Sequence, residues 1–97
     1  MMPAYVIADV TVTDPAAMEE YRKQVPATIA KYGGRYLVRG GAHEALEGEW
    51  KPNRLVILEF PTMAQARRWY DCEEYEGPKA LRMKAGRTNV VIVEVMA

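Results

Sequence analysis

The decapeptide YGGRYLVRGG, residues 32–41, holds four of the seven glycines in the chain. Between its two glycine pairs lies RYLVR, which predicts a short strand at residues 35–39. Glycine is unfavourable inside regular structure, so each pair should mark a boundary. We predict that Gly33 or Gly34 ends a helix in the left-handed conformation, and that Gly40 and Gly41 make a bulge or sharp bend in a longer strand.

The sequence before this stretch predicts a strand followed by a helix. Residues 4–12, AYVIADVTV, are apolar and β-branched, as in a strand. Asp14 and Pro15 then form a helix-start signal. Pro26 should bend or break that helix near Val25. The apolar stripe of the helix comprises Met18, Tyr21, Val25, Ile29 and Tyr32.

The sequence after this stretch predicts two more strands around helical segments. Residues 54–60, RLVILEF, and 88–95, TNVVIVEV, read as strands. Thr62 and Gln65 form a capping box for a helix at about 63–71, in which Trp69 should anchor the core. A further helical stretch at 73–85 is expected to be interrupted at Gly77 and Pro78. The order β-α-β-β-α-β predicts one α+β domain over residues 1–97, ferredoxin-like with a four-stranded antiparallel sheet.

Charge and cysteine content limit the function classes. The 97 residues include 13 basic and 13 acidic side chains, so the net charge is zero. We therefore expect neither nucleic acid nor a membrane surface as partner. The single cysteine, Cys72, excludes an internal disulfide, and its acidic neighbours Glu73 and Glu74 predict an inert thiol. With no signal-peptide pattern at the start of the sequence, these features predict a cytoplasmic protein.

Side-chain alternation predicts a sheet that is apolar on both faces. We expect the helices to cover the purely apolar faces, comprising Val6, Ala8, Val10 and Val12, then Val56, Leu58 and Phe60, then Val91, Val93 and Val95. The opposite face then exposes Tyr5, Ile7, Leu37, Leu55, Ile57, Val90 and Ile92. Burying those seven side chains represents about 10–20 kcal/mol, an upper bound. We predict a homodimer that buries this face; alternatively, the glycine-rich loop covers it.

Several segments together resemble a known family. They are GGRYLVRGG, LEGEW, RLVILEFPTMAQARRWY, EEY and the pair Leu81 and Arg82. Over nearly its whole length the chain resembles the domain-of-unknown-function 1330 family of the dimeric α+β-barrel superfamily. The resemblance implies a ferredoxin-like protomer and a dimer with facing sheets, but no reaction. The wider superfamily includes cofactor-free monooxygenases, lactone isomerases, dehydratases, haem-degrading enzymes and binding proteins, so the fold alone does not select a function.

Three residues are candidate proton acceptors. Asp9 and Glu59 are expected at the same end of the cavity, because we expect their strands to run parallel. Either could act as a general base if burial raises its pKa. Arg35 or Arg39 should neutralise Glu59, and a purely structural ion pair is the alternative. His43 is a proton shuttle if it points into the cavity, and otherwise a solvated loop residue.

The candidate ligand-binding residues are Tyr5, Arg39, Gly40, Gly41 and Trp50. Arg39 and exposed amides at the two glycines suit an anion. No cofactor is predicted, and one histidine without a cysteine cluster argues against a zinc site. Three functions stay open. The first is binding of a small organic molecule, anions included, near Arg39, Glu59 and Tyr5. The others are a cofactor-independent monooxygenase, isomerase or dehydratase acting on a small organic acid or phenol, and a purely structural dimer.

Overall fold

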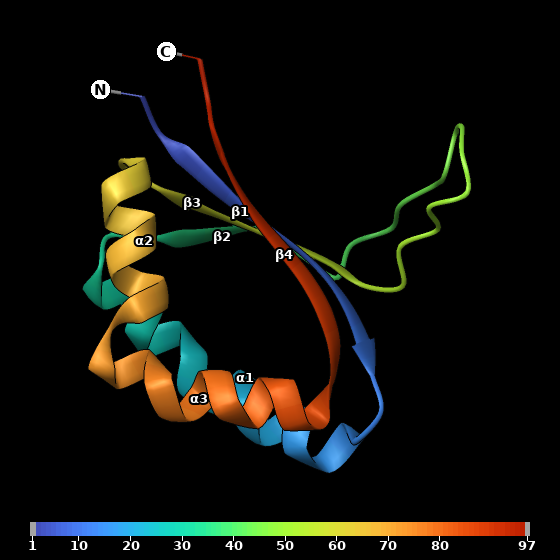
Figure 1. Cartoon of the computed structure of the whole chain (residues 1–97), viewed down its shortest axis with the longest axis horizontal. Coiled ribbons are helices and arrows are strands. Elements are labelled where there is room, and N and C mark those ends of the chain that lie inside the picture. The colour runs from blue at the N-terminus through green and yellow to red at the C-terminus, as the bar shows by residue number, and fades with distance from the viewer. Residues whose placement is uncertain (1, 97) are drawn as a thin grey trace.

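The computed structural model describes residues 2–96. Its elements are β1 (Ala4–Val12), α1 (Pro15–Lys31), β2 (Arg35–Arg39), β3 (Leu55–Phe60), α2 (Met63–Asp71), α3 (Glu73–Ala85) and β4 (Gly86–Glu94). The strands form one antiparallel sheet in the order β2-β3-β1-β4, and the helices cover one of its faces (Figure 1). The predicted α+β, ferredoxin-like architecture is therefore confirmed. Within the described residues, no helix is long and apolar enough to cross a membrane.

The boundaries of α1 follow from local chemistry. The Asp14 carboxylate accepts a hydrogen bond from the Ala17 amide at 3.2 Å, and Pro15 occupies the first turn. Gly33 ends the helix with φ +79°, and the Gly34 amide donates to the Ile29 carbonyl at 3.0 Å. The predicted break at Pro26 is wrong, because α1 continues to Lys31.

Helix α3 likewise runs without interruption through Gly77 and Pro78, contrary to the prediction. Its buried residues are Tyr75, Pro78, Arg82 and Ala85, which share one helical face. The Pro78 ring thus lies on the buried stripe. Packing of this stripe stabilises the helix despite the hydrogen bond that proline removes.

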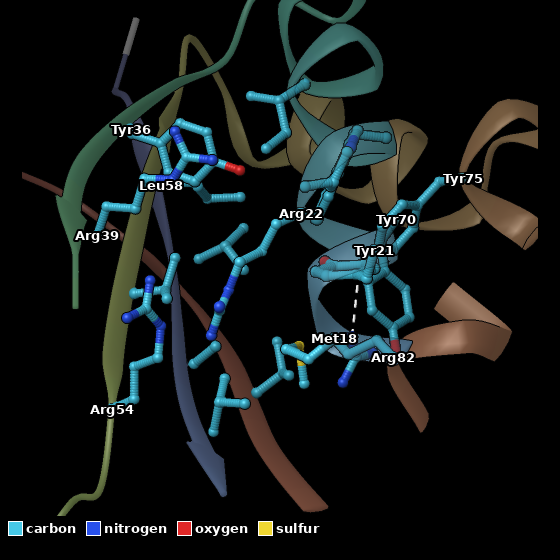
Figure 2. A pocket seen from close by; sticks show the side chains of 18 residues that line it. Met18, Tyr21, Arg22, Tyr36, Arg39, Arg54, Leu58, Tyr70, Tyr75 and Arg82 are labelled. Carbon is cyan, nitrogen blue, oxygen red and sulfur yellow. Dashed lines mark hydrogen bonds between the residues drawn. The ribbon is translucent and has the colours of Figure 1, made fainter. Parts of the chain in front are cut away.

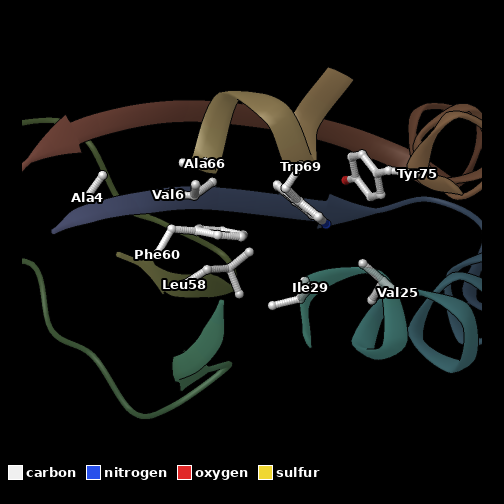
Figure 3. Close-up of a cluster of buried hydrophobic side chains, with 9 residues drawn as sticks. All are labelled: Ala4, Val6, Val25, Ile29, Leu58, Phe60, Ala66, Trp69 and Tyr75. Atoms are coloured by element: carbon white, nitrogen blue, oxygen red, sulfur yellow. The ribbon is translucent and has the colours of Figure 1, made fainter. Parts of the chain in front are cut away.

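Trp69 of α2 lies at the centre of the core, as predicted (Figure 3). Its side chain is 3% exposed, and its ring centroid lies 5.4 Å from that of Phe60 and 4.2 Å from that of Tyr75. The indole N–H donates to the Thr28 hydroxyl at 3.0 Å. Trp69 therefore joins α2 to the sheet, to α3 and to α1.

The face prediction is confirmed for β1 and β3 but wrong for β4. Val6 pairs with Ile92, and Ile7 pairs with Val91. Ile92 therefore packs against the core, whereas Val91 is 57% exposed. The pairing with β1 sets this register, and both faces of β4 are apolar, so alternation alone could not choose between them.

Strands β1 and β3 are antiparallel neighbours, so the expectation that they run parallel is wrong. Asp9 pairs with Leu55, and Glu59 pairs with Tyr5. The two carboxylates are four residues apart along β1, which corresponds to about 13 Å. Asp9 and Glu59 consequently lie toward opposite ends of the sheet.

The bulge lies inside β2 and not at the second glycine pair. The pairing of β2 with β3 shifts between Tyr36 and Val38, which leaves Leu37 as the extra residue. This shift places Arg35 beside Glu59 and Arg39 beside Val56. Gly40 then turns the chain with φ +72°, and the loop that follows projects from the body of the molecule (Figure 1).

Candidate functional site

A pocket lies between the inner face of the sheet and the helices (Figure 2). It encloses about 670 Å³ of empty space, including its opening to solvent. The apolar part of its wall comprises Val6, Ala8, Val10, Met18, Val25, Ile29, Val56, Leu58, Trp69 and Val90.

Three arginines from separate segments of the chain share one part of this pocket. Arg22 extends from α1, while Arg39 and Arg54 lie on the sheet side (Figure 2). Burial lowers the pKa of Arg54, and the positive charges of Arg22 and Arg39 lower it further. The Arg39 guanidinium lies 4.4 Å from the ring centroid of Tyr36. These side chains hold a concentrated positive charge beside an apolar floor.

Gly40 makes room for this cluster. A Cβ atom at Gly40 would overlap the guanidinium of Arg54, and the positive φ of Gly40 also favours glycine. The Gly40 amide donates to the Leu55 carbonyl at 2.8 Å. The close approach expected at this glycine is therefore made by an arginine of the chain itself.

A second polar group lies on the α1 and α3 side of the pocket. The hydroxyls of Tyr21 and Tyr75 are 2.8 Å apart, and Arg82 Nε donates to the Tyr75 hydroxyl at 3.3 Å. Burial is the largest cause that raises the pKa of Tyr21, and Tyr75 raises it further. Burial also raises the pKa of Tyr36. The phenols of Tyr21 and Tyr36 therefore stay protonated near neutral pH and can donate hydrogen bonds.

Among residues 2–96, no Asp or Glu lines the pocket, although four arginines do. Within residues 2–96, no Asp or Glu oxygen lies within 4.0 Å of Arg39, Arg54 or Arg82. Arg22 has one such contact, at 3.5 Å to the exposed Glu19. Arg82 is the buried charge among these four, and buried charges are normally paired, so this arrangement favours an anion supplied from outside.

The predicted proton acceptor Asp9 lies outside this pocket. Its carboxylate accepts hydrogen bonds from the Trp50 indole at 2.9 Å and from the Asn53 amide at 3.0 Å. The Trp50 hydrogen bond is the largest cause of a lowered Asp9 pKa, and Asn53 adds to it. A general base near neutral pH would need a raised pKa, so the structure gives Asp9 a loop-anchoring contact instead.

Glu59 and Tyr5 lie on the uncovered face of the sheet, as cross-strand partners. Glu59 accepts a hydrogen bond from Arg35 Nε at 2.7 Å, which confirms Arg35 as one of the two expected ion-pair partners. Arg39 faces the pocket and is the only predicted site residue among those that line it. The structure therefore separates Glu59 and Tyr5 from Arg39.

His43 closes the base of the projecting loop. Its Nε2 lies 2.8 Å from the Pro52 carbonyl, and its Nδ1 lies 3.2 Å from the Gly41 carbonyl. A carbonyl only accepts hydrogen bonds, so both contacts require the doubly protonated ring. The Pro52 hydrogen bond is the largest cause of a raised His43 pKa, followed by that to Gly41, and the charge of Asp9 adds to both.

We expect the His43 ring to titrate above its ordinary pKa of about 6.5. A raised folded-state pKa stabilises the closed loop below the unfolded value, and this contribution is lost as pH rises through the folded value. Proton NMR can follow the ring directly, because His43 is the only histidine. Asp9→Asn should lower the midpoint slightly. A wild-type midpoint at or below 6.5 would contradict the two-carbonyl contact.

Sequence reasoning missed Arg22, Arg54 and Arg82 and the tyrosines around them. A usable signal was present on the helices. Arg22 lies between Met18 and Val25 at helical spacing, and Arg82 lies between Pro78 and Ala85 in the same way. An arginine on an apolar stripe indicates a charge that faces inward. Within residues 2–96, no three His, Cys, Asp or Glu side chains gather to hold a metal ion.

Residues 3–96 match the model of a family described as Domain of unknown function (DUF1330). A comparison with curated proteins gave no match. Among solved structures, the chain is similar to a protein of unknown function from Rhodopseudomonas palustris, with a TM-score of 0.76 and 15% identity. That match covers 99% of this chain and 84% of the other.

Two further structures share the fold. One is a dimeric ferredoxin-like protein of unknown function from Jannaschia sp., with a TM-score of 0.69, 14% identity and coverage of 96% of this chain and 99% of the other. The second is SnoaB, a cofactor-independent oxygenase from Streptomyces nogalater, with a TM-score of 0.69 and 14% identity. It is matched over 100% of this chain and 96% of its own. At these identities the likeness establishes the fold alone.

Proposed function

Since the chain belongs to the family described as Domain of unknown function (DUF1330), we propose its function from its own residues: it binds a small organic anion in the pocket between sheet and helices. The observation that carries this proposal is the set of four pocket arginines without a lining carboxylate. The apolar floor suits a hydrocarbon or aromatic body, and the guanidinium groups suit a carboxylate.

Binding is tested with benzoate, phenylacetate and octanoate, using calorimetry and thermal unfolding. A ligand at about 100 times its Kd adds about 2.7 kcal/mol to the free energy of unfolding. We expect Arg54→Gln to weaken binding about tenfold or more, because it removes a charge-assisted hydrogen bond. Arg87→Gln is the matched control, since Arg87 is exposed and lies outside the pocket. If Arg54→Gln and Arg87→Gln bind the ligand with equal affinity, the ligand does not bind in this pocket.

A cofactor-independent enzyme is the second candidate. Two observations favour it: the hydrogen-bonded Tyr21 and Tyr75 hydroxyls in the pocket, and the likeness to a structure described as a cofactor-independent oxygenase. An oxygen electrode distinguishes the candidates, with 4-hydroxybenzoate as a phenolic acid. Oxygen uptake that Tyr21→Phe abolishes would favour the enzyme. Binding without oxygen uptake favours a binding protein. If neither binding nor oxygen uptake is detected, the purely structural dimer is the remaining candidate.

We also propose a homodimer formed by the uncovered face of the sheet. This face carries apolar side chains that no helix covers, including Val91 at 57% and Val93 at 45% exposure. Ile7 and Ile57 are cross-strand partners on the same face. Two similar structures are described as dimeric ferredoxin-like proteins, which supports the proposal. Contiguous apolar patches of this kind mark interaction surfaces.

Light scattering at micromolar concentration should return about twice the chain mass of 11.0 kDa. Val91→Lys should shift the mass toward that of one chain, because it places a charge within the apolar face. Met83→Lys is a matched control, since Met83 is 59% exposed and lies on helix α3, outside that face. A wild-type mass near 11.0 kDa would exclude this dimer.

A further inference from the structure

The arginines of the pocket form two separate poles. Arg22, Arg39 and Arg54 make the outer pole (Figure 2). Arg22 and Arg39 are close enough to Arg54 for their positive charges to act on it. Arg82 makes the inner pole on α3, where it also lines a second recess against β4. Arg39 belongs to β2, and β2 and β4 are the two edge strands of the sheet. Arg39 on β2 lies three strand spacings, about 14 Å, from β4, and Arg54, directly before β3, lies two spacings, about 10 Å, from it, so the outer pole lies across the sheet from the recess that Arg82 lines.

The inner pole lacks a counter-charge. Arg82 is 5% exposed, has no carboxylate within 4.0 Å in the part of the chain described, and donates through Nε to the Tyr75 hydroxyl. A guanidinium carries five N–H donors, so one phenol satisfies only part of it. Its remaining N–H groups border the open pocket, where an anion can accept hydrogen bonds from them.

A second observation points to the same place. Thr88 lines the recess that Arg82 shares, and its hydroxyl is buried without a hydrogen-bond partner. Within residues 2–96 this is the one buried side-chain polar atom in that condition. Buried hydroxyls are nearly always paired, so the recess favours an added oxygen-bearing group.

The middle of the pocket is apolar, because the cross-strand row that leads from Arg39 to β4 consists of Val56, Ala8 and Val90, all of which line the pocket. We infer that the ligand is a two-headed anion, an apolar chain with a carboxylate at each end, of which one lies at the outer arginines and the other at Arg82. This inference rests on the proposed anion-binding function and extends it to a substrate class, the extended dicarboxylates. A compact monoanion would leave one pole without a counter-charge.

The test compares acids of matched length by calorimetry on the full chain: adipate, suberate and sebacate against hexanoate, octanoate and decanoate. For at least one length, the dicarboxylate should bind about tenfold more tightly, the value of one charge-assisted hydrogen-bonded contact. Arg82→Gln should abolish that preference, because it removes the charge of the inner pole. Thr88→Val should reduce the preference, and the exposed Arg87→Gln should retain it.

The outcomes separate the two proposals. Monocarboxylates that bind as tightly as dicarboxylates at every length would overturn the two-headed ligand and leave the anion pocket standing. No binding of either series would overturn the anion pocket and this inference with it. Circular dichroism of Arg82→Gln and Thr88→Val checks that each variant is folded. A preference that survives in folded Arg82→Gln would also overturn the assignment of the inner pole.

Discussion

Replacing Trp69 with alanine should lower the free energy of unfolding by about 3 to 5 kcal/mol. Net stability of a small domain is about 5 to 15 kcal/mol, so this one change removes a large part of it. The reason is the position of the side chain, which is 3% exposed and stacks between Phe60 and Tyr75. Alanine would leave a cavity and would also leave the Thr28 hydroxyl without its indole donor.

Trp50→Ala is the matched control for Trp69→Ala. Trp50 is 61% exposed and makes one side-chain hydrogen bond, to Asp9. Removing the Trp50 side chain should lower the free energy of unfolding by about 0.5 kcal/mol, as is usual for surface substitutions. Urea unfolding is followed by circular dichroism at one protein concentration, because dimer formation would make stability depend on concentration. A loss below about 1 kcal/mol for Trp69→Ala would contradict its central place in the core.

The elements that sequence predicts well are those whose ends depend on nearby residues. Asp14 caps α1 through an amide three residues away, and Thr62 caps α2 through the amide of Gln65 in the same way. Gly33 ends α1 because only a residue free to adopt positive φ fits there. Each of these signals acts over a few residues and needs no knowledge of the tertiary structure.

The errors concern relations between distant segments. Val90 and Ile92 on one face of β4 are as apolar as Val91 and Val93 on the other, so only pairing with β1 decides which face meets the helices. A shift of one residue exchanges the two faces. The β2 bulge likewise changes which side chains share a face. Its extra residue places Arg35 on the uncovered face, beside Glu59, and Arg39 on the face of the pocket. No local pattern in RYLVR contains that information.

The pocket was the hardest part to predict. Its arginines come from α1, β2, α3 and the position directly before β3, and no short motif joins them. Reasoning from strand alternation led instead to Asp9 and Glu59, which face the uncovered side of the sheet or its loop. The better guide was on the helices, where Arg22 and Arg82 interrupt otherwise apolar stripes. Burying a charge at such a position costs free energy of folding, so its presence there indicates a functional site.

Removing the buried charge of Arg82 should make the protein more stable. Arg82→Met should raise the free energy of unfolding of the ligand-free protein by about 1 to 4 kcal/mol, the range seen when buried charges are replaced by apolar residues of similar volume. Methionine fills the space of the arginine stem without a charge. Tyr75 retains its hydrogen bond with the Tyr21 hydroxyl, so the substitution leaves no new unpaired group.

Binding should change in the opposite direction. Arg82→Met should lose the affinity advantage of dicarboxylates over monocarboxylates, because the inner pole is gone. A residue whose removal stabilises the fold and weakens the ligand is retained for binding and not for structure. Arg68→Met is the control, since Arg68 is exposed on α2, outside the pocket, and its change should stay within about 0.5 kcal/mol. If Arg82→Met unfolds more easily than wild type, the Arg82 contact with Tyr75 supports the fold, and the buried charge then needs no ligand to explain it.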